Sequence, residues 1–246
     1  MWGVFGRRRK KSEKSGAADI AEVVERKGPP PEPDKADDKY RAAGPWDASE
    51  EAPEEARMDL GSIRVPVRPG TEIQVNVAQQ RNQIIGVTLI SGGSALQVQP
   101  FAAPKSSGLW DEMREELREQ ITGQGGKAED FDGAFGPELR AIIPVEGKKS
   151  DQGRQLGQRV RFIGVDGPRW VLRGVVRGDG AAKPEAMAQI EELFQKIVVV
   201  RGDNPVPPRD LLTITVPPEV QKSMAEAAKK RAAGPKPPPQ GGGAGG

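Results

Sequence analysis

The stretch QLGQRVRFIGVDGPRWVLRGVVR, residues 155–177, decides the fold of this chain. It holds two runs of alternating apolar and polar residues, which are typical of strands, and the turn-forming residues Asp166, Gly167 and Pro168 lie between them. A two-residue loop at Asp166-Gly167 would place a polar residue opposite an apolar one. A three-residue loop, Asp166 to Pro168, keeps both faces consistent and leaves the proline out of the hydrogen-bond ladder. The sequence therefore predicts an antiparallel hairpin with the longer loop.

This loop also predicts the register of the hairpin. On the core side Phe162 faces Leu172 and Val160 faces Gly174, and on the other side Arg161 faces Arg173. One sheet face then carries an arginine stripe made of Arg159, Arg161, Arg169, Arg173 and Arg177. Like charges opposite one another destabilise a sheet, so we expect counter-charges from an acidic N-terminal arm, from a partner or from phosphate. The stripe is therefore a candidate site for a partner or an anion, and a solvated or internally paired face is the alternative.

Short runs rich in β-branched residues continue on both sides of the hairpin. Four of them are separated by short turns, which predicts an antiparallel meander of strands at 63–67, 71–78, 83–90 and 94–102. Further strands are expected at 127–132, 138–144 and 211–216.

Two helices complete the expected domain. Apolar residues recur at helical spacing over 108–122, where Ser107 can cap the helix, and the second helix begins at Pro184. The second helix directs four side chains inward: Met187, Ile190, Phe194 and Ile197. We therefore expect one α+β domain over residues 58–217, in which an antiparallel sheet of about seven to nine strands packs with two helices.

Both ends of the chain have compositions that do not support a core. Residues 1–57 form a basic N-terminus and an acidic, proline-rich arm, which we expect to be disordered. Within this arm, the segment Gly44-Pro45-Trp46-Asp47 is expected to fold back onto the domain as an aromatic clamp. Residues 218–246 predict a weak basic helix to about Ala233 and then a disordered Pro/Gly tail.

The first residues form a second candidate binding site. Two aromatic residues are followed by five consecutive cations: Trp2, Phe5, Arg7, Arg8, Arg9, Lys10 and Lys11. Each basic residue contributes about 1 kcal/mol of attraction to an anionic membrane, so weak and reversible attachment is one interpretation. Nucleic-acid phosphate would satisfy the same residues without sequence preference, and a basic tail with no specific target is the third interpretation. Because neither a secretory signal nor a membrane-spanning run is recognisable, we expect a cytoplasmic protein in peripheral contact with a membrane at most.

The chain has no histidine and no cysteine. This excludes imidazole acid/base catalysis, thiolate nucleophiles and disulfides, as well as zinc, haem and iron–sulfur sites that need those ligands. Carboxylates, lysines, hydroxyls or a hard metal held by oxygen remain. The carboxylate candidates Asp132, Asp166, Asp179 and Asp203 all lie beside a glycine in an expected turn, where local hydrogen bonding already explains an aspartate. We therefore predict no catalytic residue, no metal ligand and no cofactor.

Several blocks of the sequence resemble an actinobacterial family of unknown function, numbered 3710. The blocks are FGRRRKK (5–11), GPWD (44–47), DLG (59–61), FAAPK (101–105), VDGPRW (165–170) and VVRG (199–202). The resemblance implies an intracellular protein of a high-GC bacterium and carries no activity with it. The order of strands and helices also loosely resembles Mog1/PsbP-like domains, a likeness of architecture that implies no function.

These observations lead to three hypotheses about function. The first is a non-enzymatic binding or adaptor protein that recognises an acidic partner protein or an anionic surface. The second is a hydrolase-type enzyme that uses carboxylates and a hard metal, and the third is a non-specific nucleic-acid-associated protein. A cleft with convergent carboxylates would favour the enzyme, whereas an arginine stripe covered by the arm would favour the adaptor. The sequence leaves the oligomeric state open.

Overall fold

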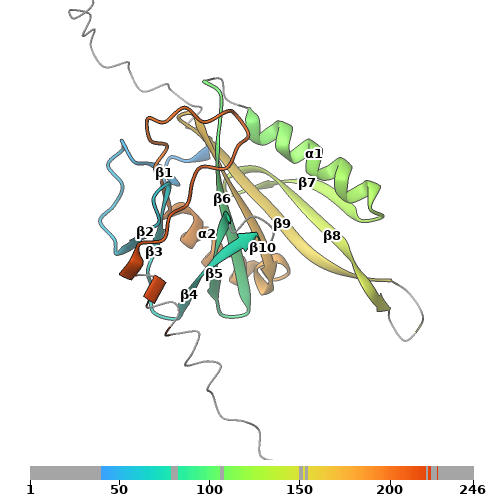
Figure 1. Cartoon of the computed structure of the whole chain (residues 1–246). Coiled ribbons are helices and arrows are strands. Elements are labelled where there is room, and N and C mark those ends of the chain that lie inside the picture. The colour runs from blue at the N-terminus through green and yellow to red at the C-terminus, as the bar shows by residue number, and fades with distance from the viewer. Residues whose placement is uncertain are drawn as a thin grey trace, which may run out of the picture. The chain divides into compact units, whose positions relative to one another are not determined.

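A computed structural model describes residues 40–78, 83–105, 108–149, 152, 155–219, 221–222 and 226. Residues 1–39 and the tail from residue 227 lie outside this part of the chain, and so does the disorder that we expect for them. A seven-stranded antiparallel sheet forms the middle layer, with one helix on each of its faces (Figure 1). The mixed α+β class and the two packed helices confirm the expectation from the sequence.

The large sheet joins two meanders. The first consists of β4 (Thr71–Ala78), β5 (Gln83–Ser91) and β6 (Ser94–Ala102). The second consists of β7 (Lys127–Gly133), β8 (Gly136–Lys149), β9 (Gln155–Gly167) and β10 (Trp170–Gly178). Helix α1 (Leu109–Gly123) connects them, and the spatial order β4-β5-β6-β10-β9-β8-β7 places β6 beside β10.

A second, four-stranded sheet has the order β1-β11-β3-β2. Its strands are very short: β1 (Trp46–Asp47), β2 (Arg57–Asp59), β3 (Ile63–Pro66) and β11 (Val198–Val199). Strand β11 follows the 3₁₀ turn η2 (Asp179–Ala181) and helix α2 (Pro184–Gln195). Strand β3 was expected as the first strand of the meander, and this was wrong, because it pairs with β2 and β11 instead of β4.

Each face of the large sheet has its own apolar core. On the α1 face, side chains of β8, β9 and β10 pack with Trp110 and Met113. On the α2 face, the sheet packs with the small sheet and with four buried residues of the α2 region, which are the predicted Met187, Ile190, Phe194 and Ile197. A sheet buried on both faces carries apolar residues at successive positions instead of alternate ones.

This double burial explains why the predicted hairpin register is wrong. Val160 and Phe162 of β9 face α1, whereas Ile163 and Val165 face α2. Because apolar residues point to both faces, the alternation of apolar and polar residues in the sequence could not show how the two strands are aligned. The observed ladder pairs Trp170 with Gly167, so the loop consists of Pro168 and Arg169 and not of Asp166 to Pro168.

The observed register replaces all three predicted pairs. It sets Phe162 opposite Val175, Leu172 opposite Val165, Gly174 opposite Ile163, Arg161 opposite Val176 and Arg173 opposite Gly164. Arg169 has a φ of 62°, as the third position of a type II turn requires. The Arg169 carbonyl accepts hydrogen bonds from the Ala103 amide at 2.9 Å and from the Arg201 side chain at 3.1 Å. These two contacts hold the turn in a backbone conformation that arginine rarely adopts.

Three further expectations concern single elements of the chain. Residues 211–216 do not form a strand, because Leu211 and Ile214 make only isolated bridges, to Phe101 and Gly61. Helix α1 begins after Gly108, and Ser107, its expected cap, lies outside the described residues. Beyond Pro217, residues 218–219, 221–222 and 226 are helical, which covers the start of the predicted basic helix.

The predicted clamp at residues 44–47 is confirmed. The Trp46 amide donates to the carbonyl of Ile197 at 2.9 Å, so that β1 lies parallel to β11. The buried Asp47 carboxylate accepts a hydrogen bond from the Trp170 indole at 2.6 Å. The arm from Tyr40 onward is therefore part of the folded domain.

Candidate functional site

The five arginines of the predicted stripe do not share one face of the sheet. Arg159 and Arg161 lie on the α2 face of β9, whereas Arg173 and Arg177 lie on the α1 face of β10. Arg169 is exposed in the turn between the two strands. The register therefore separates the stripe into two pairs and one turn residue.

The pair on β10 is engaged within the domain. Arg173 donates to the Gln99 side chain at 2.6 Å, and its guanidinium lies 4.9 Å from the centre of the Phe101 ring. Burial lowers the pKa of Arg173. Arg177 donates to Gln97 at 3.3 Å. Within the part of the chain that the structure describes, glutamines of β6 are thus the side-chain hydrogen-bond partners of these two arginines.

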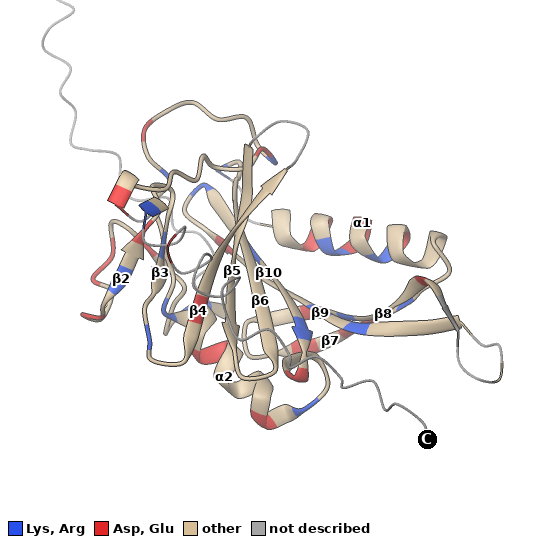
Figure 2. Ribbon diagram, turned by 60° about the horizontal axis from the view of Figure 1, so that its bottom comes forward, with Lys and Arg blue, Asp and Glu red and all other residues tan. Residues whose placement is uncertain are grey.

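The pair on β9 belongs to a groove with a volume of about 280 Å³ on the α2 face. Its floor is formed by β7, β8 and β9, and its wall by Ala181 and Ala182 at the start of the α2 region. The polar and charged lining residues are Lys127, Glu129, Arg140, Arg159 and Arg161. Figure 2 shows the basic stretches of β8 and β9 side by side. We call this concavity the basic groove.

The strand register arranges the floor of the basic groove in rows. The inner row consists of Glu129, Arg140 and Arg161, and the outer row of Lys127, Ile142 and Arg159. Next to the inner row, Phe131 lies opposite Glu138. Each strand thus contributes one side chain to each row, and the two rows differ in how their charges are compensated.

The two arginines of the inner row are paired with Glu138, which lies in the adjacent row of the same sheet face. This carboxylate is 2% exposed and accepts two hydrogen bonds from Arg161, at 2.7 and 3.1 Å, and one from Arg140 at 2.7 Å. Glu191 of α2 lies 3.6 Å from Arg161. Burial raises the pKa of Glu191, while Arg161 lowers it. Among the described residues, Glu138 and Glu191 are therefore the counter-charges for Arg161.

The outer row is open to a ligand. Lys127 and Arg159 are exposed, and neither forms an ion pair within the part of the chain that the structure describes. Ile142, between them, is 43% exposed. In the row next to the inner row, Phe131 is 46% exposed, and the Arg140 guanidinium lies 3.2 Å from the centre of its ring. The groove therefore presents cations together with apolar surface.

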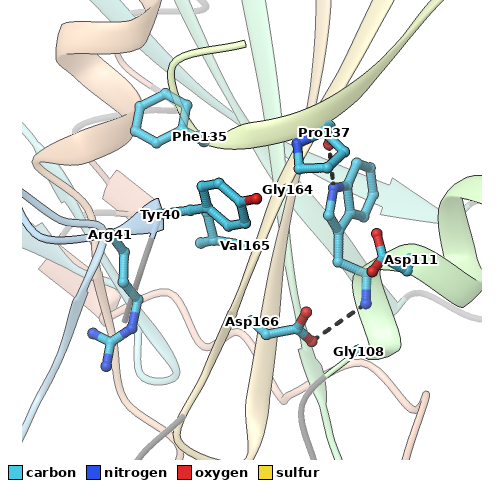
Figure 3. A pocket seen from close by; sticks show the side chains of 10 residues that line it. Tyr40, Arg41, Gly108, Asp111, Phe135, Pro137, Gly164, Val165 and Asp166 are labelled. Atoms are coloured by element: carbon cyan, nitrogen blue, oxygen red, sulfur yellow. Dashed lines mark hydrogen bonds between the residues drawn. The ribbon is translucent and has the colours of Figure 1, made fainter. Parts of the chain in front are cut away.

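A separate pocket of about 220 Å³ lies at the start of α1, on the other face (Figure 3). The Trp110 indole donates to the Pro137 carbonyl at 2.8 Å, and Gly164 lets the indole lie directly on β9, since a Cβ there would be 2.5 Å from the ring. Tyr40 directs its ring into the pocket, whereas the Arg41 side chain extends away from Asp166. Arg41 forms an ion pair with Glu50 at 2.8 Å.

Asp166 is the more buried of the two acidic residues that line this pocket. Its carboxylate accepts a hydrogen bond from the Trp110 amide at 3.3 Å, so it caps α1 from a distant strand. Burial raises the pKa of Asp166, the backbone amides of Trp110, Gly108 and Leu109 lower it, and the nearby Asp111 raises it. Local hydrogen bonding in a turn, the explanation expected from the sequence, does not describe this aspartate, because it lies within β9.

Asp111 and Asp166 both line the pocket, which is the pattern that the enzyme hypothesis requires. However, Asp111 forms an ion pair with Arg114 at 2.7 Å, and Asp166 is engaged by the amides at the start of α1. Across the described residues, no group of three or more acidic side chains could hold a metal ion. Among the other carboxylate candidates, Asp179 pairs with Lys183 at 3.0 Å.

The basic N-terminal candidates, Trp2, Phe5 and Arg7 to Lys11, lie outside the described residues. In the part that is described, no helix is long and apolar enough to cross a membrane.

Sequence reasoning missed four residues of the basic groove and its support: Lys127, Glu138, Arg140 and Ile142. One signal was available, because Glu138, Arg140 and Ile142 alternate with the buried Leu139 and Ala141 along one expected strand. That pattern indicates a second face, but only the pairing of β8 with β9 shows that this face meets Arg159 and Arg161.

The sequence blocks that carry the family resemblance meet around the β9–β10 turn. Asp47 bonds to Trp170, and Ala103 and Arg201 both bond to the Arg169 carbonyl. These contacts bring GPWD, FAAPK, VVRG and VDGPRW together at one end of the large sheet. The blocks therefore mark a structural junction.

Comparisons with known proteins agree with this resemblance. Neither the curated proteins nor the solved structures gave a match, so the likeness to Mog1/PsbP-like domains stays a prediction. One family model, described as "Protein of unknown function (DUF3710)", matches residues 44–223, which is more than half of the chain. This span begins at the GPWD clamp and includes the whole of both sheets. The chain therefore belongs to the DUF3710 family.

Proposed function

We propose that this chain is a non-enzymatic binding protein that holds an acidic partner protein in the basic groove. The observation that carries the proposal is the outer row, where Lys127 and Arg159 are exposed without ion pairs among the described residues. Uncompensated cations in a concavity attract anionic ligands, because the walls limit screening by water. The inner row adds Arg140 and Arg161, whose positions are held by Glu138.

The surroundings of the groove favour a protein over a nucleic acid. Two carboxylates border it, since Glu129 is part of the floor and Glu191 of α2 lies 3.6 Å from Arg161. The opposite face of these strands carries α1, in which five acidic residues outnumber two arginines. A nucleic acid carries a phosphate at every nucleotide and would meet this repulsion along its length. A protein can place a few carboxylates at the cations and uncharged residues elsewhere.

The proposal is tested by fluorescence anisotropy with labelled polyglutamate as the probe. The groove variant carries Lys127→Glu and Arg159→Glu. The matched control carries Lys105→Glu and Arg169→Glu, which reverses two exposed cations outside the groove. All proteins keep the basic N-terminus, so its contribution to polyanion binding is the same in each of them.

We expect the groove variant to bind polyglutamate at least about tenfold more weakly than the wild type, and the control to differ by no more than about twofold. Equal losses in both variants would show that the anion responds to overall charge, which contradicts the proposal. A labelled oligothymidylate serves as the second probe. If it binds more tightly than polyglutamate and loses affinity with the groove variant, the nucleic-acid hypothesis replaces the present one.

A further inference from the structure

Strands β7, β8 and β9 are covered unequally on their two faces. On one face, α1 packs along all three strands. On the other face, α2 reaches Arg161 of the inner row through Glu191, and β8 and β9 extend well beyond it (Figure 1). A sheet in an α+β domain is normally covered by helices or by another sheet, and here the outer part of one face lacks such a cover among the described elements.

The outer row combines charged and apolar side chains, and a single ligand can contact all of them. Reading across the strands, it consists of a cation, an aliphatic side chain and a cation: Lys127, Ile142 and Arg159. An inorganic anion or a chain of phosphates would leave Ile142 in contact with water. A ligand with an apolar residue between two carboxylates would use all three side chains, and burial of an aliphatic side chain adds to the affinity.

The spacing of this row fits a helix. Neighbouring strands lie about 4.8 Å apart, so the outer two of three strands are separated by about 9.5 Å. In an α-helix, residues seven apart return to nearly the same face after a rise of about 10.5 Å. Two acidic residues seven apart, with an apolar residue midway on the same face, therefore match the row. An added strand fits less well, because the free edge of β7 carries four charged residues: Lys127, Glu129, Asp130 and Asp132.

We infer that the occupant of the basic groove is an acidic amphipathic helix of a partner protein, whose apolar residue packs on Ile142 while flanking carboxylates meet Lys127 and Arg159. This inference rests on the proposed function. It adds that the bound segment of the partner is a helix and that one of its apolar residues packs on Ile142. Recognition of a helix through apolar positions flanked by charge is a known mode of peptide binding.

The test uses two labelled peptides of identical composition and the full chain. In the striped peptide, glutamates seven residues apart share one helix face with a leucine midway between them, which is the pattern that matches the outer row. In the scrambled peptide, the same residues are distributed around the helix. The protein variants are Ile142→Ser and, as a matched control, Leu156→Ser. Leu156 is 44% exposed, against 43% for Ile142, and strand alternation places it on the other face of β9.

We expect the wild type to bind the striped peptide about tenfold more tightly than the scrambled one, and Ile142→Ser to remove most of this difference while Leu156→Ser preserves it. Equal affinity for both peptides would overturn the inference, and so would equal effects of the two serine variants. If both peptides bind equally and the charge-reversed groove variant loses both, the proposed function stands without the helix. If neither peptide nor polyglutamate binds, both fail.

Discussion

Replacement of Glu138 by glutamine is expected to destabilise the domain by about 3–5 kcal/mol, the usual cost of removing one partner from a buried ion pair. The structure gives the physical reason. The Glu138 side chain is 3% exposed and that of Arg161 is 10% exposed, so neither can recover its interactions with water. Glutamine keeps the size of the side chain and one acceptor, but it removes the negative charge.

The loss in the free energy of unfolding depends on which negative charges remain near Arg161 when Glu138 is replaced. Its next carboxylate, Glu191, is 3.6 Å away, beyond hydrogen-bond distance. Arg140 loses less, because its side chain is 42% exposed and can turn to water. Most of the expected cost therefore comes from the single guanidinium that stays buried without a full counter-charge.

Urea unfolding followed by circular dichroism measures this cost. Glu129→Gln is the matched control, since Glu129 lies in the neighbouring row on the same sheet face but is exposed, and we expect it to change stability by less than about 0.5 kcal/mol. A loss below about 1 kcal/mol for Glu138→Gln would refute the reasoning. The double variant Glu138→Leu/Arg161→Met provides an independent check, because replacing both charges by apolar groups should recover most of the loss.

Three further predictions concern other parts of the chain. Asp47→Ala should cost about 1–3 kcal/mol in urea unfolding, because it leaves the buried Trp170 indole without an acceptor; an unchanged midpoint would refute this. Since burial raises the pKa of Asp166 above its ordinary value of 3.8, folding favours its protonated form. Relative to Asp166→Asn, the wild type should lose stability as the pH rises from about 4 through the raised pKa, and parallel pH profiles would contradict this. Substitution of residues 7–11 by glutamine should reduce co-sedimentation with anionic vesicles at low salt by at least about tenfold, whereas equal sedimentation would exclude membrane attachment through this cluster.

Local signals in the sequence located the elements of the large sheet well. The alternation of Ile73, Val75 and Val77 predicts the strand that the structure shows as β4, with the same bounds. Pro184 begins α2 as expected, because proline is favoured at the first helical position. These predictions succeed because each depends on residues close together in the chain.

Features that depend on pairing between distant segments could not be predicted in this way. Ile63 to Pro66 has the composition of a strand, but nothing local to it indicates that it pairs with β11, more than 130 residues later. The hairpin register failed for a related reason. Without knowing that the second half of β9 is buried on both faces, we treated one face as solvent-exposed and therefore placed five arginines together on it.

The corrected register also changes which arginines can be replaced to test binding of a ligand. Arg161 is held by Glu138, and Arg173 is buried against Gln99 and Phe101. Replacing either of them would disturb the fold, so a loss of binding in such a variant could not be assigned to a lost contact with the ligand. Arg159 differs because it is exposed and has no ion pair among the described residues. Substitution of all five arginines at once would mix these effects, whereas reversal of Arg159 together with Lys127 changes the charge of the groove and leaves the buried network intact.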